Sequence, residues 1–197
     1  MQLSMRMGRH QILLDCDRHF EQAGRSVLLK LSELDQRGPA LGDGSKVQFG
    51  WSVLTLRLEQ ENLRIYEPDY FGDALHGLRP TLDTTLEVIT EQAEVLRRER
   101  VEGLDARFDH YVLAWPGALA AREIFLSRRS DRQPDDTGWF IGDLALLDSG
   151  ATDKVLEALR VFELLKLRRS VMQVLALPPG YAVVMRGGEI DSMAKGE

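Results

Sequence analysis

The sequence predicts an α+β fold with mostly antiparallel sheets and two main helices. Three observations predict it. Apolar and polar side chains alternate over residues 48–58 and 62–67, with a polar turn between them, which is typical of an antiparallel hairpin. Apolar side chains recur every three or four positions over residues 82–100 and 153–168, which is typical of helices that pack on one face. Short strand-like runs separated by Gly and Pro account for most of the remaining chain.

The region before the first predicted helix is mostly β structure. A short apolar run at residues 10–16 indicates a strand. Residues 25–34 fit either a helix or a buried strand, because their periodicity does not separate the two. Three glycines and a proline indicate a loop at residues 38–45. Pro68 ends the second strand of the hairpin, within an acidic and aromatic loop at residues 67–73.

The helix over residues 82–100 has the clearest pattern in the chain. One stripe of apolar side chains runs along it: Leu82, Leu86, Ile89, Ala93 and Leu96. Thr84 and Glu87 have the spacing of a capping box at its start. Acidic residues lie in the first turns and arginines in the last, as the helix dipole favours, and Gly103 provides a stop.

Four more strands are expected in the second half of the chain. They cover residues 108–115, 122–129, 139–141 and 181–185, and each is bounded by Gly, Pro or a polar loop. Between the last two lies the expected second main helix, residues 153–168, with Thr152 as its cap. Residues 170–177 fit either a short helix or a strand, and the small polar tail from Gly187 is expected to fray.

The charge of the chain is spread evenly. Residues 1–100 carry 13 basic and 16 acidic side chains, and residues 101–197 carry 12 and 15, so each half has a net charge of −3. Neither half is a basic lobe, which argues against direct binding of nucleic acid. A mildly acidic surface suits a basic partner, although it first indicates solubility.

Cysteine content and the N-terminal residues bear on the compartment. Cys16 is the single cysteine, so no internal disulfide is possible, which fits a reducing environment. The first residues are too polar to open a signal peptide, and no apolar run approaches membrane-spanning length. We expect a cytoplasmic protein that does not contact a membrane.

Two acidic loops with aromatic residues form the candidate binding surface. Aromatic side chains provide buried area at an interface, and carboxylates steer and pair with a basic partner. The candidate partner-binding residues are Glu67, Asp69, Tyr70, Asp73, Asp131, Asp135, Asp136, Trp139 and Asp143. The alternative is that both loops are ordinary solvated turns and that Trp139 is a core residue. Asp135 and Asp136 lack the alternate-residue spacing of an EF-hand loop, so we expect no metal. The sequence has neither a Walker A loop nor a dinucleotide fingerprint, so we expect no cofactor.

Three short motifs in order carry a resemblance to a known family. They are FLSRR at residues 125–129, DTGWFIG at 136–142 and LPPGY at 177–181. In this order they resemble the immunity-protein-33 domain family, small bacterial domains found beside toxin genes, over roughly residues 122–190. None of the three is a catalytic signature.

The resemblance implies an inhibitor of a cognate toxin and not an enzyme. It places an immunity-protein-33-like domain at residues 121–197 and leaves residues 1–120 as an N-terminal α/β region of unassigned family. The implied partner is a cognate toxin or effector protein, with a cytoplasmic type VI secretion effector as the first expectation. A nuclease is the first guess for its activity, because a nucleic-acid groove is basic and complements acidic loops.

Two other classes of function stay open at this point. Cys16 and His19 form the one cluster that suggests chemistry, since a nearby imidazolium lowers the pKa of a thiol, and would make a small hydrolase or transferase. The alternative for this pair is a buried structural cysteine beside an exposed histidine. A non-catalytic adaptor domain without a toxin partner is the third possibility.

Overall fold

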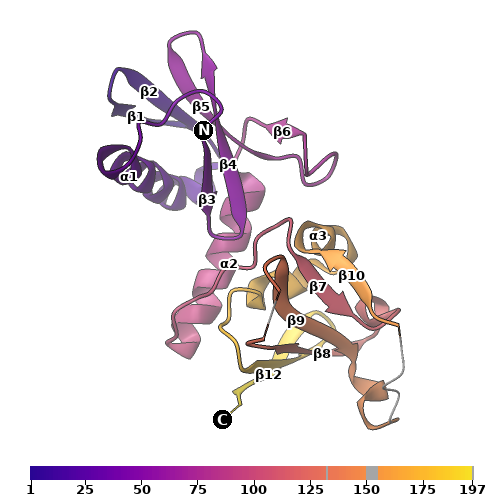
Figure 1. Cartoon of the computed structure of the whole chain (residues 1–197). Coiled ribbons are helices and arrows are strands. Elements are labelled where there is room, and N and C mark those ends of the chain that lie inside the picture. Colours follow the sequence, from indigo (N-terminus) through magenta and orange to yellow (C-terminus); the bar gives the residue numbers. More distant parts are fainter. Residues whose placement is uncertain (132, 150–154, 197) are drawn as a thin grey trace. The chain divides into compact units, whose positions relative to one another are not determined.

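The chain folds into two compact units, Met1–Glu91 (unit 1) and Gln92–Glu197 (unit 2). The computed structural model in Figure 1 describes residues 1–131, 133–149 and 155–196. Each unit contains one six-stranded sheet, and in both sheets most neighbouring strands are antiparallel. The predicted α+β class is therefore confirmed.

Unit 1 is a sheet with the strand order β1-β2-β5-β4-β3, and β6 is attached to β5. The pair β2–β5 is parallel, and the other pairs of this sheet are antiparallel. The strands are β1 (Gln2–Met7), β2 (His10–Asp15), β3 (Lys46–Phe49), β4 (Ser52–Glu59), β5 (Asn62–Pro68) and β6 (Leu78–Arg79). A 3-10 turn, η1 (Arg18–Phe20), leads from β2 into helix α1 (Glu21–Arg37).

Residues 25–34, which fitted either a helix or a buried strand, lie in helix α1. It buries Gly24, Val27, Leu28 and Leu31, which recur at helical spacing and lie on one face. These side chains pack with the inward-facing residues of the strands in one core cluster. A Cβ at Gly24 would lie 2.8 Å from Leu3 Cδ1, so a glycine here permits the close approach of helix and sheet.

The hairpin of β4 and β5 is confirmed, but the strand predicted over residues 48–58 is in fact two strands. The chain reverses between β3 and β4 at Gly50, whose φ is +57°, and Phe49 pairs with Ser52 across this turn. Because Gly50 tolerates a positive φ, a two-residue turn fits inside an apparently continuous alternation. Trp51 follows the glycine and is fully buried.

Helix α2 (Asp83–Glu99) confirms the predicted helix over residues 82–100. Leu82 and Leu86 are buried, as the apolar stripe predicts, but Ile89 and Leu96 are only half-buried and Ala93 is exposed. The second half of the helix buries Gln92 and Val95 instead. The first half of α2 belongs to unit 1 and the second half to unit 2. The two main helices are therefore α1 and α2.

Unit 2 is a sheet with the strand order β10-β7-β9-β8-β11-β12. Its strands are β7 (Tyr111–Ala114), β8 (Glu123–Arg128), β9 (Asp136–Asp143), β10 (Glu157–Arg160), β11 (Tyr181–Arg186) and β12 (Glu189–Lys195). The pair β7–β9 is parallel. The helical segments are η2 (Ala118–Ala120), η3 (Leu144–Ser149), η4 (Val161–Glu163), α3 (Leu164–Leu167) and η5 (Arg169–Val174).

The prediction of a helix over residues 153–168 is wrong. Its described part contains strand β10, turn η4 and the four-residue helix α3. Val155 is 85% exposed, so the expected apolar face is not buried, whereas Leu164 and Leu165 are buried side by side. Strand β10 is fixed by its pairing with β7, a non-local contact that outweighs local periodicity. Thr152, the expected cap, lies outside the described residues.

The expectation of a frayed tail is also wrong, because the tail forms strand β12. Gly187 and Gly188 both have positive φ, +58° and +93°, and form the tight turn between β11 and β12. A Gly-Gly pair between two runs is a hairpin signal. Tyr181 pairs with Lys195, so the strand continues almost to the end of the chain. Residues 170–177 contain most of the 3-10 helix η5, so the short-helix alternative is the one that forms, as 3-10 helix, and the strand alternative is wrong.

Candidate functional site

The loop between β5 and β6 is shaped by its own acids. Asp69 Oδ1 accepts a hydrogen bond from the Gly72 N–H (3.2 Å), and Asp73 Oδ1 accepts from the N–H groups of Leu75 and His76 (3.1 Å each). The bond from the His76 backbone is the main cause that lowers the pKa of Asp73 below its ordinary value. Both acids therefore fix the loop conformation in addition to presenting charge.

Tyr70 anchors this loop in the core and does not reach the surface. Its side chain is 1% exposed and stacks on Trp51 with the ring centroids 4.6 Å apart. Its hydroxyl donates to Ser52 Oγ at 2.6 Å. Burial raises the pKa of this phenol well above its ordinary value, so it stays protonated.

Glu67 is an interior carboxyl at the start of helix α2. It is 1% exposed and accepts hydrogen bonds from the backbone N–H groups of Thr85 (2.8 Å) and Thr84 (3.4 Å). Glu67, which lies far away in sequence, therefore satisfies donors in the first turn of α2, where a capping box of Thr84 and Glu87 was expected. Burial raises the pKa of Glu67 to about 7, although these hydrogen bonds act in the opposite direction.

The exposed part of the first loop differs from the predicted set. Asp73 is exposed and Asp69 is half-buried. The aromatic side chain at the surface is Phe71, which is 50% exposed. Leu75, two residues after Asp73, is 45% exposed. Glu67 and Tyr70 are buried, so their side chains support the loop and cannot contact a partner.

Three of the predicted acids lie in the second loop or at its junction with β9, whose first residue is Asp136. Asp131 and Asp135 are exposed, and Asp136 is half-buried. Asp136 Oδ2 forms an ion pair with Arg129 (2.8 Å), and its Oδ1 accepts from the Gly138 N–H (2.7 Å). Asp136 therefore has a structural role, whereas the exposed Asp131 and Asp135 present charge to solvent.

Trp139 and Asp143 do not join this acidic loop. Trp139 is fully buried, and its indole N–H donates to the Leu175 carbonyl at 2.9 Å. Asp143 pairs with Ile124 at the far end of β9 and accepts from the Ala145 N–H (3.0 Å). Seven residue steps along the strand separate Asp136 from Asp143, a distance of about 23 Å. Asp143 is therefore remote from the other acids of this set.

Arg128 connects the segments that the three family motifs cover. It is 2% exposed, and its guanidinium donates to the carbonyls of Thr137 (3.0 Å) and Leu175 (3.0 Å) and to that of Leu104 (2.7 Å). Its own carbonyl accepts from the Gly180 N–H at 2.8 Å. The motifs therefore meet around one buried arginine and hold unit 2 together.

The role of Arg128 was not predicted, although the sequence contains a signal for it. Ile124 and Leu126 are buried on β8, and Arg128 has the same position in the alternation. Arg128 also lies over the Trp139 ring, 5.7 Å from its centroid. An arginine in register with buried strand residues indicates an interior hydrogen-bonding role.

Cys16 lacks the environment of a reactive thiol. It is 4% exposed, and burial is the largest cause that raises its pKa above the ordinary value. A raised pKa disfavours the thiolate that nucleophilic chemistry requires. His19 is exposed, and its ring lies against Phe20 with the centroids 5.1 Å apart.

The described residues contain neither a cluster of metal-ligating side chains nor a helix that could span a membrane. The described residues contain no group of three or more His, Cys, Asp or Glu side chains placed to hold a metal ion. No helix in the described part of the chain is long and apolar enough to cross a membrane.

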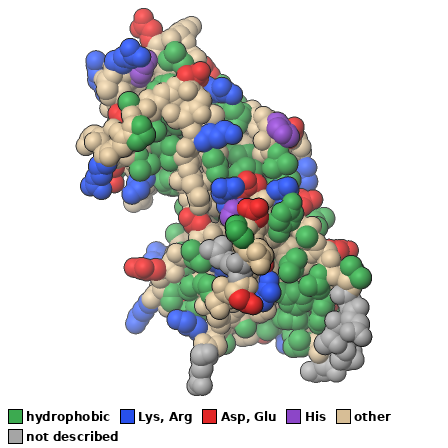
Figure 2. Space-filling model, viewed as in Figure 1, with side chains coloured by type: hydrophobic (Ala, Val, Ile, Leu, Met, Phe, Trp, Pro, Cys, Tyr) green, Lys and Arg blue, Asp and Glu red, His purple; other side chains and the backbone are tan. Residues whose placement is uncertain are grey.

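On the face shown in Figure 2, acidic and basic side chains are interspersed over each unit. This face lacks the concentrated positive surface that a phosphate backbone requires.

Comparison with known families identifies the C-terminal region. Residues 91–195 match the model of the Imm33-like domain, and this is more than half of the chain. The chain belongs to the Imm33-like domain family. The match contains all three motifs that were noticed in the sequence. Neither a curated protein nor a solved structure matches the chain. The division into regions 1–120 and 121–197 stays a prediction.

Proposed function

We propose that this Imm33-like protein binds a cognate bacterial toxin and neutralises it. Membership of an immunity-protein family is the observation that carries the proposal. The mechanism is stoichiometric: the protein covers the active site of the toxin or blocks its working conformation. The raised pKa of the buried Cys16 supports a role in binding over a role in thiol catalysis.

The exposed acids before β9 are the proposed contact surface within the family region. Asp131 and Asp135 are exposed, and Asp135 directly precedes the half-buried Asp136. Carboxylates at the rim of an interface accelerate the encounter with a basic partner and fix its orientation. Asp69, Asp73 and the half-exposed Phe71 form a second proposed contact surface in unit 1. The interior residues Glu67, Tyr70 and Trp139 and the remote Asp143 are left out of these surfaces.

The proposed target is an effector that acts in the cytoplasm, and a type VI secretion effector is the first candidate. A nuclease fits acidic contact loops best, because its substrate groove carries the positive charge that phosphates require. Occlusion of that groove would place the exposed acids where nucleic acid otherwise binds.

The contact surface is tested with charge-reversal variants and the product of a neighbouring gene that stops growth when it is expressed alone. Asp131→Lys with Asp135→Lys is expected to weaken toxin binding by about tenfold to a hundredfold, because two favourable charges become repulsive. The matched control is Glu102→Lys with Glu189→Lys, which makes the same change of charge at exposed positions elsewhere in unit 2. Surface plasmon resonance at two salt concentrations measures the effect. Equal affinity of the test and control variants would move the contact surface elsewhere.

A further inference from the structure

A hollow lies where two hairpin turns meet at one end of the unit 1 sheet. Strands β2 and β5 are parallel neighbours, so the β1–β2 turn and the β4–β5 turn lie at the same end. The hollow has a volume of about 320 Å³ and is lined by six polar residues: Arg6, Arg9, His10, Gln11, Glu61 and Asn62. It lies outside the region that matches the Imm33-like domain.

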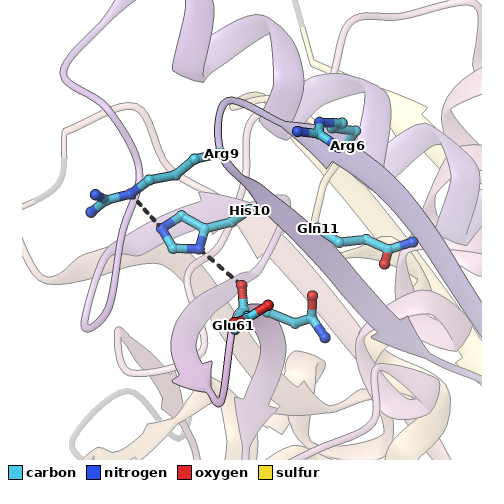
Figure 3. A pocket seen from close by; sticks show the side chains of 6 residues that line it. Arg6, Arg9, His10, Gln11 and Glu61 are labelled. Atoms are coloured by element: carbon cyan, nitrogen blue, oxygen red, sulfur yellow. Dashed lines mark hydrogen bonds between the residues drawn. The ribbon is translucent and has the colours of Figure 1, made fainter.

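Hydrogen bonds join the two turns and orient the side chains, as Figure 3 shows. Arg9 Nε donates to His10 Nε2 at 3.0 Å, so this ring nitrogen is unprotonated. The proton is then on His10 Nδ1, which donates to the Glu61 carbonyl at 3.0 Å. Arg9 is held through one N–H, and the four N–H groups at the end of its guanidinium remain for a ligand.

The hollow contains more hydrogen-bond donors than acceptors. Among the described residues, no carboxylate lies within ion-pair distance of Arg6 or Arg9. Gln11, which faces Arg6 across the β1–β2 pair, uses one amide N–H to bond Ser4 Oγ (2.9 Å) and retains the other. Glu59, a further acid at this end of the sheet, is occupied by Arg64 at 2.8 Å. Glu61 is the one acid in the lining.

We propose that this hollow binds a phosphate group. A carboxylate presents two oxygens in one plane, which a single guanidinium satisfies, whereas a phosphate accepts hydrogen bonds from several directions. Two guanidinium groups and the amides of Gln11 and Asn62 supply donors from both turns. The phosphate is either inorganic phosphate or a phosphate carried by a small molecule. This site is independent of the proposed toxin binding.

Glu61 gives the proposal a distinctive signature. Its carboxylate lines the same hollow as the two arginines and repels an anion there. Replacing it with an isosteric neutral side chain removes the repulsion and keeps the backbone carbonyl that His10 bonds. Glu61→Gln is therefore expected to tighten phosphate binding by several-fold, an effect that non-specific attraction to a distant surface would not show.

The test is an NMR titration of the full chain with inorganic phosphate in chloride buffer. Saturable amide shifts are expected at residues 8–11 and 60–62. Arg6→Gln and Arg9→Gln are each expected to weaken binding by about tenfold or more, since each removes a charged donor. The matched control is Arg25→Gln, an exposed arginine of α1 that pairs with Glu21, and it is expected to leave binding unchanged. Absence of saturable shifts, or equal binding by Arg6→Gln and Arg25→Gln, would overturn the proposal.

Titrations with adenosine monophosphate and with adenosine separate the two sources of phosphate. Tighter binding of the monophosphate than of inorganic phosphate identifies a carried phosphate as the ligand. Equal affinities identify the free anion. Adenosine is expected not to bind, and binding of adenosine as tight as that of its monophosphate would contradict a phosphate site.

Discussion

The interior carboxyl of Glu67 makes the stability of unit 1 depend on pH. The folded protein holds the pKa of this group at about 7, whereas the ordinary value is 4.5. The folded state therefore binds the proton more tightly than the unfolded state between these values. Binding of this proton therefore stabilises the folded state. The stabilisation is complete below about pH 4.5 and is lost as the pH rises through 7.

The size of the effect follows from the shift. A pKa difference of one unit corresponds to about 1.4 kcal/mol, so the wild-type protein is expected to lose about 2–3 kcal/mol from this group between pH 5 and pH 8. Glu67→Gln removes the titration but keeps a carbonyl oxygen for the Thr85 N–H. The free energy of unfolding of Glu67→Gln, minus that of the wild type, is therefore expected to rise by about 2–3 kcal/mol from pH 5 to pH 8.

Urea denaturation at several pH values between 5 and 8 measures this difference. The stacked pair of Trp51 and Tyr70 lies next to Glu67 in the fold. Tryptophan fluorescence reports on unit 1 through Trp51 when Trp115 and Trp139 of unit 2 are replaced by Phe in both proteins. Glu61→Gln is the control, because Glu61 is exposed. A difference between wild type and Glu67→Gln that stays constant from pH 5 to pH 8 would refute the argument that burial raises this pKa.

Three further predictions concern unit 2 and the thiol. Arg128→Met is expected to cost about 3 kcal/mol or more, because it leaves several buried carbonyls unpaired, whereas Arg129→Met at the exposed neighbour is expected to cost less than about 1 kcal/mol. Urea denaturation compares the two, and equal costs would refute the buried role. Gly138→Ala is expected to cost about 1–3 kcal/mol, since φ is +79° and a Cβ would lie 2.6 Å from the Arg129 carbonyl. Gly42→Ala, where nothing lies within 4 Å, is its control in the same assay. Cys16 is expected to react slowly with a disulfide reagent in the native protein and rapidly after unfolding, and fast native labelling would contradict its burial.

Elements defined by local patterns could be predicted from the sequence. The helical period of α2 and the alternation of β4 and β5 are contained in neighbouring residues. Helix α2 and strand β5 form where they were expected, and β4 forms the second part of the strand predicted over residues 48–58. Strand β10 could not be predicted in this way, because its pairing with β7 depends on residues far away in the chain. Strand β12 did have a local signal in its Gly-Gly turn, and the polar composition of the tail obscured it.

The candidate site shows why residue type alone is a weak guide to exposure. Glu67 follows Leu63 and Ile65 in the alternation of β5, and all three are buried. Arg128 has the same relation to Ile124 and Leu126 on β8. Strand parity predicts the interior position of both charged residues, but their hydrogen-bond partners come from distant segments. Those partners become known only when the fold is known.

Co-expression with a neighbouring gene whose product is toxic when expressed alone tests the central proposal most directly. The toxin gene is induced in a host that lacks this protein, with and without a second plasmid encoding it, and growth is followed. We predict that the protein restores growth, and that the purified pair elutes as one stoichiometric complex. Unrestored growth with both proteins demonstrably expressed, and separate elution of the two, would contradict toxin neutralisation.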